Sequence, residues 1–183
     1  QEKAKENGRR NSEWDFGTNP CSEIILRPNQ FCNLTEVVVR PTDTEESLHD
    51  KIEVATILGT IQATLTDFGY LRKRWQQNTE EERLLGVSLT GIMDNSLINR
   101  RRHRLPDMLQ SMKNKAVVTN KEWADKLGIP QSTAITCVKP SGTVSQLVDS
   151  ASGIHARHNS HYIRTVRGDN KDPLTEFMKA QGI

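Results

Sequence analysis

The sequence predicts an α/β fold, because short β-branched segments alternate along it with longer segments of helical periodicity. Capping residues open several of the helical segments, and glycine or proline follows their ends. No internal repeat or low-complexity segment interrupts the alternation. With 34% hydrophobic residues in a length of 183, the chain can form one modest domain or part of a larger one.

The first half of the chain predicts strand-like structure followed by a long helix. Residues 24–39 include the β-branched run EVVVR and are closed by Pro41. The helix has Asp43 as its predicted N-cap, with Glu46 three residues later, and is expected to continue to about Arg72. Apolar residues at helical spacing predict one buried face, formed by Leu48, Ile52, Ala55, Leu58, Ile61, Leu65 and Phe68.

The second half predicts a buried strand and further helices. Thr79–Glu82 has the pattern of a second capping box, but the apolar RLLGVSLTGIMD that follows favours a turn and a buried strand. Residues 105–128 are predicted to be helical, in one or two pieces, ending at Gly128. The remaining predicted elements are a strand at 132–139, a tight PSGT loop, a helix VSQLVDSA, and a last helix framed by Asp172, Pro173 and Gly182.

Composition excludes several classes of protein. Lys+Arg 25 against Asp+Glu 23 gives a net charge of +2, which makes no case for a dedicated nucleic-acid or membrane partner. No apolar run approaches the roughly 20 residues that span a bilayer, and no signal-peptide pattern is present. The odd number of cysteines, 3, fits a reducing compartment better than a secreted disulfide framework, so we expect a cytoplasmic protein.

The two ends of the sequence suggest that it is the central portion of a longer protein. Residues 1–13 are polar, and we expect them to be mobile or to dock on parts outside the sequence. Residues 14–183 are expected to be the folded portion. The sequence has no initiator Met and stops at Gly182-Ile183, where a helix would end.

The stretch KPSGTVS lies between a predicted strand and a predicted helix. Gly142 would let the backbone approach a ligand closely, and free N–H groups at the helix start would bind phosphate. Lys139 adds positive charge, although the Walker A spacing is absent. The alternative is that the Ser, Gly and Thr residues serve only as helix caps.

Three other features favour structural explanations. His155, His158 and His161 are spaced by three and lack a close Cys or carboxylate, so loop histidines are favoured over a zinc site. The basic run 100–104 has no interleaved aromatic residue, which favours a solvated loop over a nucleic-acid site. Cys137 lies in an apolar strand, where a cysteine is usually a small buried hydrophobe.

The segment NPCSE…FCNL carries the most specific chemistry. Cys21 and Cys32 lie eleven positions apart (32 − 21), and Glu23 is two residues after Cys21. Pro20 blocks a regular helix, so Cys21 is predicted to lie on a loop, and in an extended backbone Glu23 would share its side. From the residues alone, a redox pair, a zinc site with missing ligands and two unrelated cysteines all remain open, with the redox pair ranked first.

Three stretches together resemble the catalytic barrel of ribonucleotide reductase, specifically its adenosylcobalamin-dependent class II. They are TNPCSEIILRPNQFCNLTEVVVR, EEERLLGVSLTGIMD and AITCVKPSGTVSQLVDSASGIHARH. Class I large subunits share Asn-x-Cys-x-Glu, but the eleven-position spacing of the second cysteine favours class II. The resemblance implies that 14–183 is part of a ten-stranded α/β barrel, with the Cys21 loop inserted at its centre.

The resemblance also implies roles for individual residues. Cys21 would become the thiyl radical that removes the 3′ hydrogen of the ribose, and Glu23 would take the 3′-hydroxyl proton. Asn19 would hydrogen-bond the ribose. Cys32 would be one of two cysteines that form a disulfide as the 2′-hydroxyl leaves as water. The substrate phosphates would be held by the loop of Pro140, Ser141, Gly142, Thr143 and Val144.

The same resemblance implies partners outside the sequence. Adenosylcobalamin would supply the radical while the protein orients and shields the reaction. A thioredoxin-like protein would reduce the disulfide. The partner of Cys32 would lie on an earlier strand, so the isolated chain is expected to be inactive without the remainder of the enzyme. The rivals are a class I large subunit and a non-catalytic fragment that binds phosphate or nucleic acid through KPSGT and the basic run.

Overall fold

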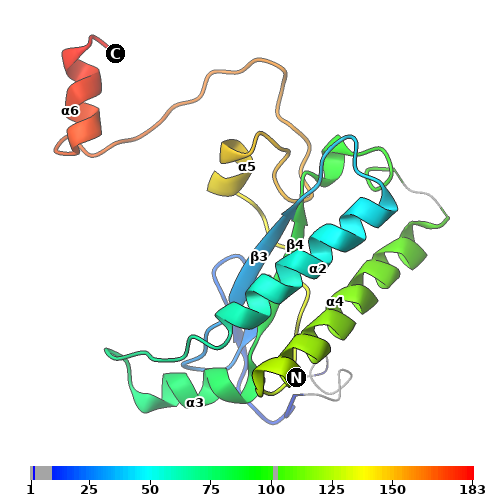
Figure 1. Ribbon diagram of the computed structural model, residues 1–183. Helices are drawn as coiled ribbons and strands as arrows, with labels where there is room; N and C mark the ends of the chain where they lie inside the picture. The colour runs from blue at the N-terminus through cyan, green and yellow to red at the C-terminus, as the bar shows by residue number, and fades with distance from the viewer. Residues whose placement is uncertain (1, 3–9, 101–102) are drawn as a thin grey trace.

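The computed structural model describes residues 2, 10–100 and 103–183 (Figure 1). Its centre is a parallel pair of strands, β3 (Asn33–Val38) and β4 (Leu85–Thr90), with Asn33 opposite Leu85 and Val38 opposite Thr90. The segment 134–137 runs beside β4 on the other side, through a single parallel bridge between Val87 and Thr136. This order, strand–helix–strand repeated, is the α/β architecture that the sequence predicts.

Two long helices, α2 (Glu45–Gln62) and α4 (Leu105–Leu127), cover the same face of this sheet and pack against each other (Figure 1). Each connects one parallel strand to the next, so both lie on one side, as right-handed crossovers require. The core between sheet and helices is formed by Val37, Val39, Leu48, Ile52, Ala55, Ala63, Leu85, Val87, Ile98, Met112, Ala116 and Ile135.

Smaller elements complete the described chain. An antiparallel hairpin pairs two short strands, and a third helix follows α2. Their bounds are β1 (Gly17–Thr18), β2 (Ile25–Leu26), α3 (Lys73–Glu82), η1 (Ile92–Asp94), α5 (Thr143–Leu147) and α6 (Pro173–Ala180). Figure 1 shows α6 away from the rest of the described chain, at the end of an extended connection. No helix of the described residues is long and apolar enough to cross a membrane.

The predicted start and end of α2 were wrong. Thr44, not Asp43, is the N-cap, and it forms a capping box with Ser47 in which the two N–H···Oγ distances are 3.2 and 3.0 Å. Asp43 instead accepts hydrogen bonds from the Arg40 amide at 2.7 Å and from Lys51 Nζ at 2.5 Å. The helix ends at Gln62 rather than near Arg72, because threonines and a glycine follow it in the sequence.

The buried face of α2 also differs from the prediction. Leu58, Ile61 and Leu65 are exposed, and the sheet contacts small residues instead. A Cβ placed on Gly59 would lie 3.3 Å from Leu85 Cδ2, so the absence of a side chain lets helix and sheet approach closely. Periodicity identified the helix but not which of its residues the sheet would contact.

Some further expectations were wrong, and the helix predicted at 105–128 was confirmed. Thr79–Glu82 is the last turn of α3 and not a capping box, because Thr79 accepts a hydrogen bond from the Phe31 amide and Glu82 pairs with Arg10. The helix predicted at 105–128 is one continuous piece, with Gly128 as its left-handed C-cap. The strand predicted at 132–139 is reduced to a bridge, and α5 is shorter than VSQLVDSA because Asp149 adopts a positive φ of 48°.

Candidate active site

Cys21 lies in the turn that joins β1 to β2, as the Asn-Pro sequence predicts. Asn19 organises this turn: its side-chain oxygen accepts the Ile24 amide at 3.1 Å, and its carbonyl accepts the Ser22 amide at 2.9 Å. Ser22 adopts a left-handed φ of 59°, and Cys21 is exposed as a free thiol. Within the described residues, the Asn19 side-chain nitrogen contacts no acceptor and is free to donate to a ligand.

A buried polar network fixes this hairpin to α3. The Arg10 guanidinium donates to Glu82 at 3.0 and 2.8 Å, and both side chains are almost fully buried, with exposures of 5% and 6%. Arg10 also donates to the Ile25 carbonyl at 2.8 Å. Gln30 joins the network by donating to Glu82 at 2.5 Å and accepting the Arg27 amide at 2.9 Å. The network therefore sets the position of the Cys21 turn relative to the sheet.

Arg10 belongs to the segment 1–13 that was predicted to be polar and mobile or docked. Its guanidinium is docked, and it also stacks on Phe16 with 4.7 Å to the ring centroid. Residues 1 and 3–9 lie outside the described residues. The boundary at residue 13 stays a prediction.

The hairpin packs on the face of the sheet opposite the helices. Leu85 and Val87 point into the helical core, so Gly86 faces the other way. A Cβ on Gly86 would lie 3.1 Å from both Ile24 Cδ1 and Cys137 Sγ and would also meet Leu34 Cδ2. Gly86 thus leaves the space into which the hairpin and Cys137 fit.

Glu23 and two thiols gather on this face. Both carboxylate oxygens of Glu23 are buried, and neither has a hydrogen-bond partner among the described residues. Burial, then the proximity of Cys137 and Glu23, raises the pKa of Cys32 to about 12. Burial and then Glu23 raise the pKa of Cys137 to about 11. Both thiols therefore carry their proton at neutral pH, beside a carboxylate that lacks a donor.

Sequence reasoning placed Cys21, Glu23 and Cys32 on one segment but did not predict that Cys137 lies close to Glu23 and Cys32. Cys137 is half-buried, and its sulfur lies within electrostatic reach of Glu23 and Cys32. Its position opposite Gly86 comes from strand pairing between segments far apart in sequence, so no local pattern could have indicated it. All three cysteines are free thiols in the structure.

The predicted phosphate loop follows the segment 134–137. Ser141 is buried, and its hydroxyl oxygen accepts the Ser145 amide at 3.1 Å. Gly142, Thr143 and Val144 are exposed at the start of α5, and their amides have no acceptor among the described residues. These amides are available to an anion, whereas Ser141 serves the loop itself.

The three histidines lie on a loop, as the sequence predicts. His155, His158 and His161 are exposed on an irregular segment, and no group of three or more potential metal ligands occurs among the described residues. Two residues of the basic run 100–104 lie outside the described part of the chain, so its structure carries no argument.

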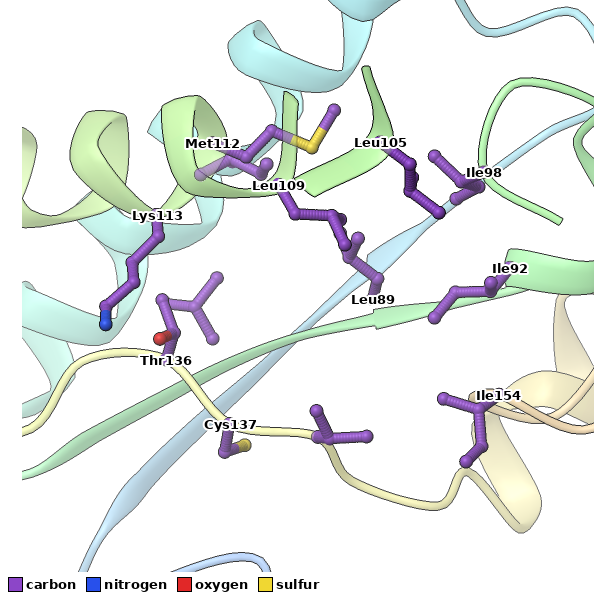
Figure 2. Close-up of a pocket in the computed structure, with 13 residues that line it drawn as sticks. Leu89, Ile92, Ile98, Leu105, Leu109, Met112, Lys113, Thr136, Cys137 and Ile154 are labelled. Carbon is purple, nitrogen blue, oxygen red and sulfur yellow. The ribbon is translucent and has the colours of Figure 1, made fainter. Parts of the chain in front are cut away.

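A separate apolar hollow of about 430 Å³ lies on the helix side, between α4 and residues 136–138. Figure 2 shows Thr136 directed toward the α4 side chains and Cys137 directed away from them. Leu105, Leu109 and Met112 of α4 line the hollow. Cys137 also contributes to the lining of the hollow, so this residue belongs both to the hollow and to the thiol–carboxylate cluster.

The fold and site define an α/β protein with a thiol–carboxylate cluster on a sheet face, followed in sequence after Cys137 by a loop with backbone amides that are free within the described residues. No family model matches the chain. Its relatives include proteins named adenosylcobalamin-dependent ribonucleoside-triphosphate reductase from Lactobacillus delbrueckii subsp. bulgaricus (31% identical), Lactobacillus leichmannii (30%) and Levilactobacillus brevis (32%). Each match covers 91% of this chain and 25% of the relative.

A solved structure gives the same result. A B12-dependent class II ribonucleotide reductase superposes on 76% of this chain and 22% of its own, with a TM-score of 0.65 and 26% identity. The chain is therefore a relative of the class II ribonucleotide reductases, and it spans about a quarter of their length. The resemblance seen in the sequence is confirmed.

Proposed function

We propose that this chain supplies the thiyl-radical loop, the catalytic carboxylate, one reducing thiol and the phosphate loop of a ribonucleotide reductase. The observation that carries the proposal is the Glu23 carboxylate, desolvated and without a donor beside the protonated Cys32 thiol. A buried carboxylate without a partner costs stability, and such groups are typical of sites that await a ligand. The names of the relatives give the substrate class, a ribonucleoside triphosphate.

In this proposal Cys21, as a thiyl radical, takes the 3′ hydrogen atom of the ribose. Glu23 takes the 3′-hydroxyl proton and holds it during the reaction. The exposure of Cys21 on the turn makes its sulfur accessible to a radical source and to the sugar. Asn19 keeps its side-chain nitrogen free to donate to the ribose, because the side-chain oxygen is engaged with Ile24.

Cys32 is proposed to supply reducing equivalents together with a cysteine outside this chain. The two thiols give two electrons and two protons: one proton leaves with the 2′-hydroxyl as water, the other proton and the two electrons form the new C2′–H bond, and the sulfurs become a disulfide. A thiol with a pKa of about 12 retains its proton until it is needed. A dithiol reductant of the thioredoxin type then restores the pair by thiol–disulfide exchange.

The substrate phosphates are assigned to the loop 140–144. Gly142, Thr143 and Val144 offer their amides, Lys139 adds charge, and Pro140 and Ser141 shape the loop. Ser141 acts indirectly in this arrangement, because its hydroxyl oxygen accepts the Ser145 amide.

The cofactor proposed for the complete enzyme is adenosylcobalamin, which would generate the radical, as the names of the relatives indicate. We assign the cobalamin contacts to the remainder of the enzyme. That remainder would also complete the ten-stranded barrel, to which 14–183 would contribute its parallel strands. A cytoplasmic location is part of the same proposal.

A chimeric enzyme tests the proposal. This chain would replace the matching quarter of the Lactobacillus leichmannii reductase, and deoxyribonucleotide formation would be measured with adenosylcobalamin and a dithiol. We expect turnover in the chimera, its loss in Cys21→Ser, and a roughly hundredfold decrease in Glu23→Gln. Cys137→Ser is the matched control and should retain most activity. Turnover by Cys21→Ser would exclude the radical assignment.

The same chimera separates the rival functions. Activity that required a di-metal partner protein in place of adenosylcobalamin would support a class I subunit. Salt-sensitive DNA binding by the chain, without nucleotide preference, would support a nucleic-acid-binding fragment. The similarity to class II reductases over 91% of the chain favours neither rival.

A further inference from the structure

The loop 139–142 rests on the segment 149–153. Gly153 lies directly beneath it: a Cβ there would be 2.8 Å from the Lys139 carbonyl oxygen and 3.3 Å from Pro140 Cα. Ser152 donates its hydroxyl to the Ser141 carbonyl, which Ser145 also contacts at 2.9 Å. The position of the loop is therefore set by the position of residues 152 and 153.

That segment is in turn attached to the carboxyl end of β4. Thr90, fully buried, donates its hydroxyl to the Ala151 carbonyl at 3.2 Å and accepts the Gly153 amide at 2.7 Å. The Gly91 amide donates to the same Ala151 carbonyl at 2.8 Å. Asp94 completes the attachment by accepting the Ala151 amide at 2.8 Å.

Asp94 also forms an ion pair with Arg157, which follows the segment in sequence and contacts Asp149 at the start of the segment. Arg157 Nε and Nη2 contact the two Asp94 oxygens at 3.0 and 3.1 Å, and Arg157 Nη1 contacts Asp149 at 2.6 Å. The exposed fractions of the side chains are 12% for Asp94, 48% for Arg157 and 89% for Asp149. The well-shielded member of this group is Asp94, which contacts both the Ala151 amide and the Arg157 guanidinium.

We propose that Asp94 is a positioning residue for the phosphate loop, acting through Ala151 and Gly153. This inference rests on the proposed function of the loop. Asp94 fixes residues 149–157 at the carboxyl end of β4. The backbone of Lys139–Ser141 packs closely against Gly153 in this segment, which fixes the position of the loop. The amides of Gly142, Thr143 and Val144 are thereby held in place for an anion before it binds, which is the preorganisation that strengthens binding.

The test is Asp94→Asn in the complete 183-residue chain, with Asp125→Asn as the matched control on the exposed side of α4. Amide hydrogen exchange and equilibrium binding of a ribonucleoside triphosphate are both measured. We expect exchange at Ala151, Gly153 and Ser145 to accelerate about tenfold, and the dissociation constant to rise about tenfold. Binding of the corresponding nucleoside, which lacks phosphate, should not change, and this is a result that general destabilisation would not give. The control should leave all three measurements unchanged.

Arg157→Lys and Arg157→Ala extend the test. Lysine keeps the charge and should recover part of the affinity that alanine loses. Unchanged exchange at Ala151 and Gly153 in Asp94→Asn would overturn the attachment, and faster exchange with unchanged triphosphate affinity would overturn the positioning role. If the unaltered chain bound no triphosphate, the proposed phosphate-binding function of the loop would be wrong. Hydrogen exchange in Asp94→Asn would still test whether Asp94 attaches residues 149–157 to the end of β4.

Discussion

The cysteine hairpin and the phosphate loop are held to the same sheet by different means. The hairpin is attached through Arg10 and Glu82, whose side chains are 5% and 6% exposed. The phosphate loop is attached through backbone hydrogen bonds and through Arg157, whose side chain is 48% exposed. Buried ion pairs are little screened by salt, whereas exposed pairs are weak and salt-sensitive. The hairpin is therefore expected to be the more rigidly fixed of the two regions.

The difference matches the proposed tasks of the two regions. A loop that carries a radical has to hold its sulfur at a fixed distance from one hydrogen atom, and misplacement is costly. A loop that binds phosphate through amides tolerates small adjustments when the anion enters. Four predictions examine this comparison.

The largest expected effect concerns the reactivity of the thiols. A rise in the pKa of Cys32 from 9.0 to about 12 is three pH units, so the thiolate fraction near neutral pH falls roughly a thousandfold. With iodoacetamide at pH 8, mass spectrometry should find exposed Cys21 modified first, then Cys137, with a pKa of about 11, and Cys32 last. Rapid modification of Cys32 would mean that the hairpin does not shield it.

The second prediction breaks the attachment of the hairpin. Glu82→Ala leaves the Arg10 guanidinium buried without its partner, and the free energy of unfolding should fall by about 3 kcal/mol. Urea denaturation measures the change. Glu122→Ala removes an exposed pair with Lys126, whose side chains are 58% and 55% exposed, and should leave the free energy of unfolding nearly unchanged. Equal effects of the two substitutions would contradict the comparison.

A third prediction concerns the packing of the hairpin on the sheet. Gly86→Ala would place a methyl group 3.1 Å from Ile24 Cδ1 and Cys137 Sγ, so the free energy of unfolding should fall by about 2 kcal/mol. Gly17→Ala is the matched control, because nothing lies within 4 Å of a Cβ there. The same denaturation experiment serves both variants, and a neutral Gly86→Ala would show that the hairpin shifts without cost.

The smallest expected effect is the acid sensitivity of the phosphate loop. Burial acts to raise the pKa of Asp94, but hydrogen bonds from Arg157 and the Ala151 amide outweigh it, with help from Arg40, and the pKa is lowered. Because the pKa of Asp94 is lower in the folded state than its ordinary value of about 4, the ionised side chain stabilises the fold when the pH is above about 4. This contribution is lost as the pH falls below about 4 and through the folded-state pKa.

Hydrogen exchange between pH 5 and pH 3 measures this effect, after correction for the intrinsic pH dependence of exchange. The Ala151 and Gly153 amides should lose protection as Asp94 becomes protonated. The same amides in Asp94→Asn provide the control, because no proton can then be gained at that position. Loss of protection in both proteins alike would contradict the assignment to Asp94.

The sequence by itself determined the types of the elements and the chemistry of the motifs. The cap of α6 by Asp172 and Pro173, the end of α4 at Gly128 and the position of Cys21 on a turn all depend on neighbouring residues. The Asn-x-Cys-x-Glu pattern and the eleven-residue spacing of the cysteines indicate the family from the sequence alone. Local rules sufficed because capping and proline geometry act over only a few residues.

Only the tertiary structure decided which of these residues meet. Leu34, Ile24 and Cys137 meet at Gly86 because a parallel pair and a bridge bring together segments that are more than fifty residues apart (86 − 34 and 137 − 86 give 52 and 51). The Arg10–Glu82 pair and the Asp94 attachment arise in the same way, at sequence separations of 72 and 57 residues. Parallel strands need a crossover helix between them, so their contacts are necessarily distant in sequence, and no local pattern carries them.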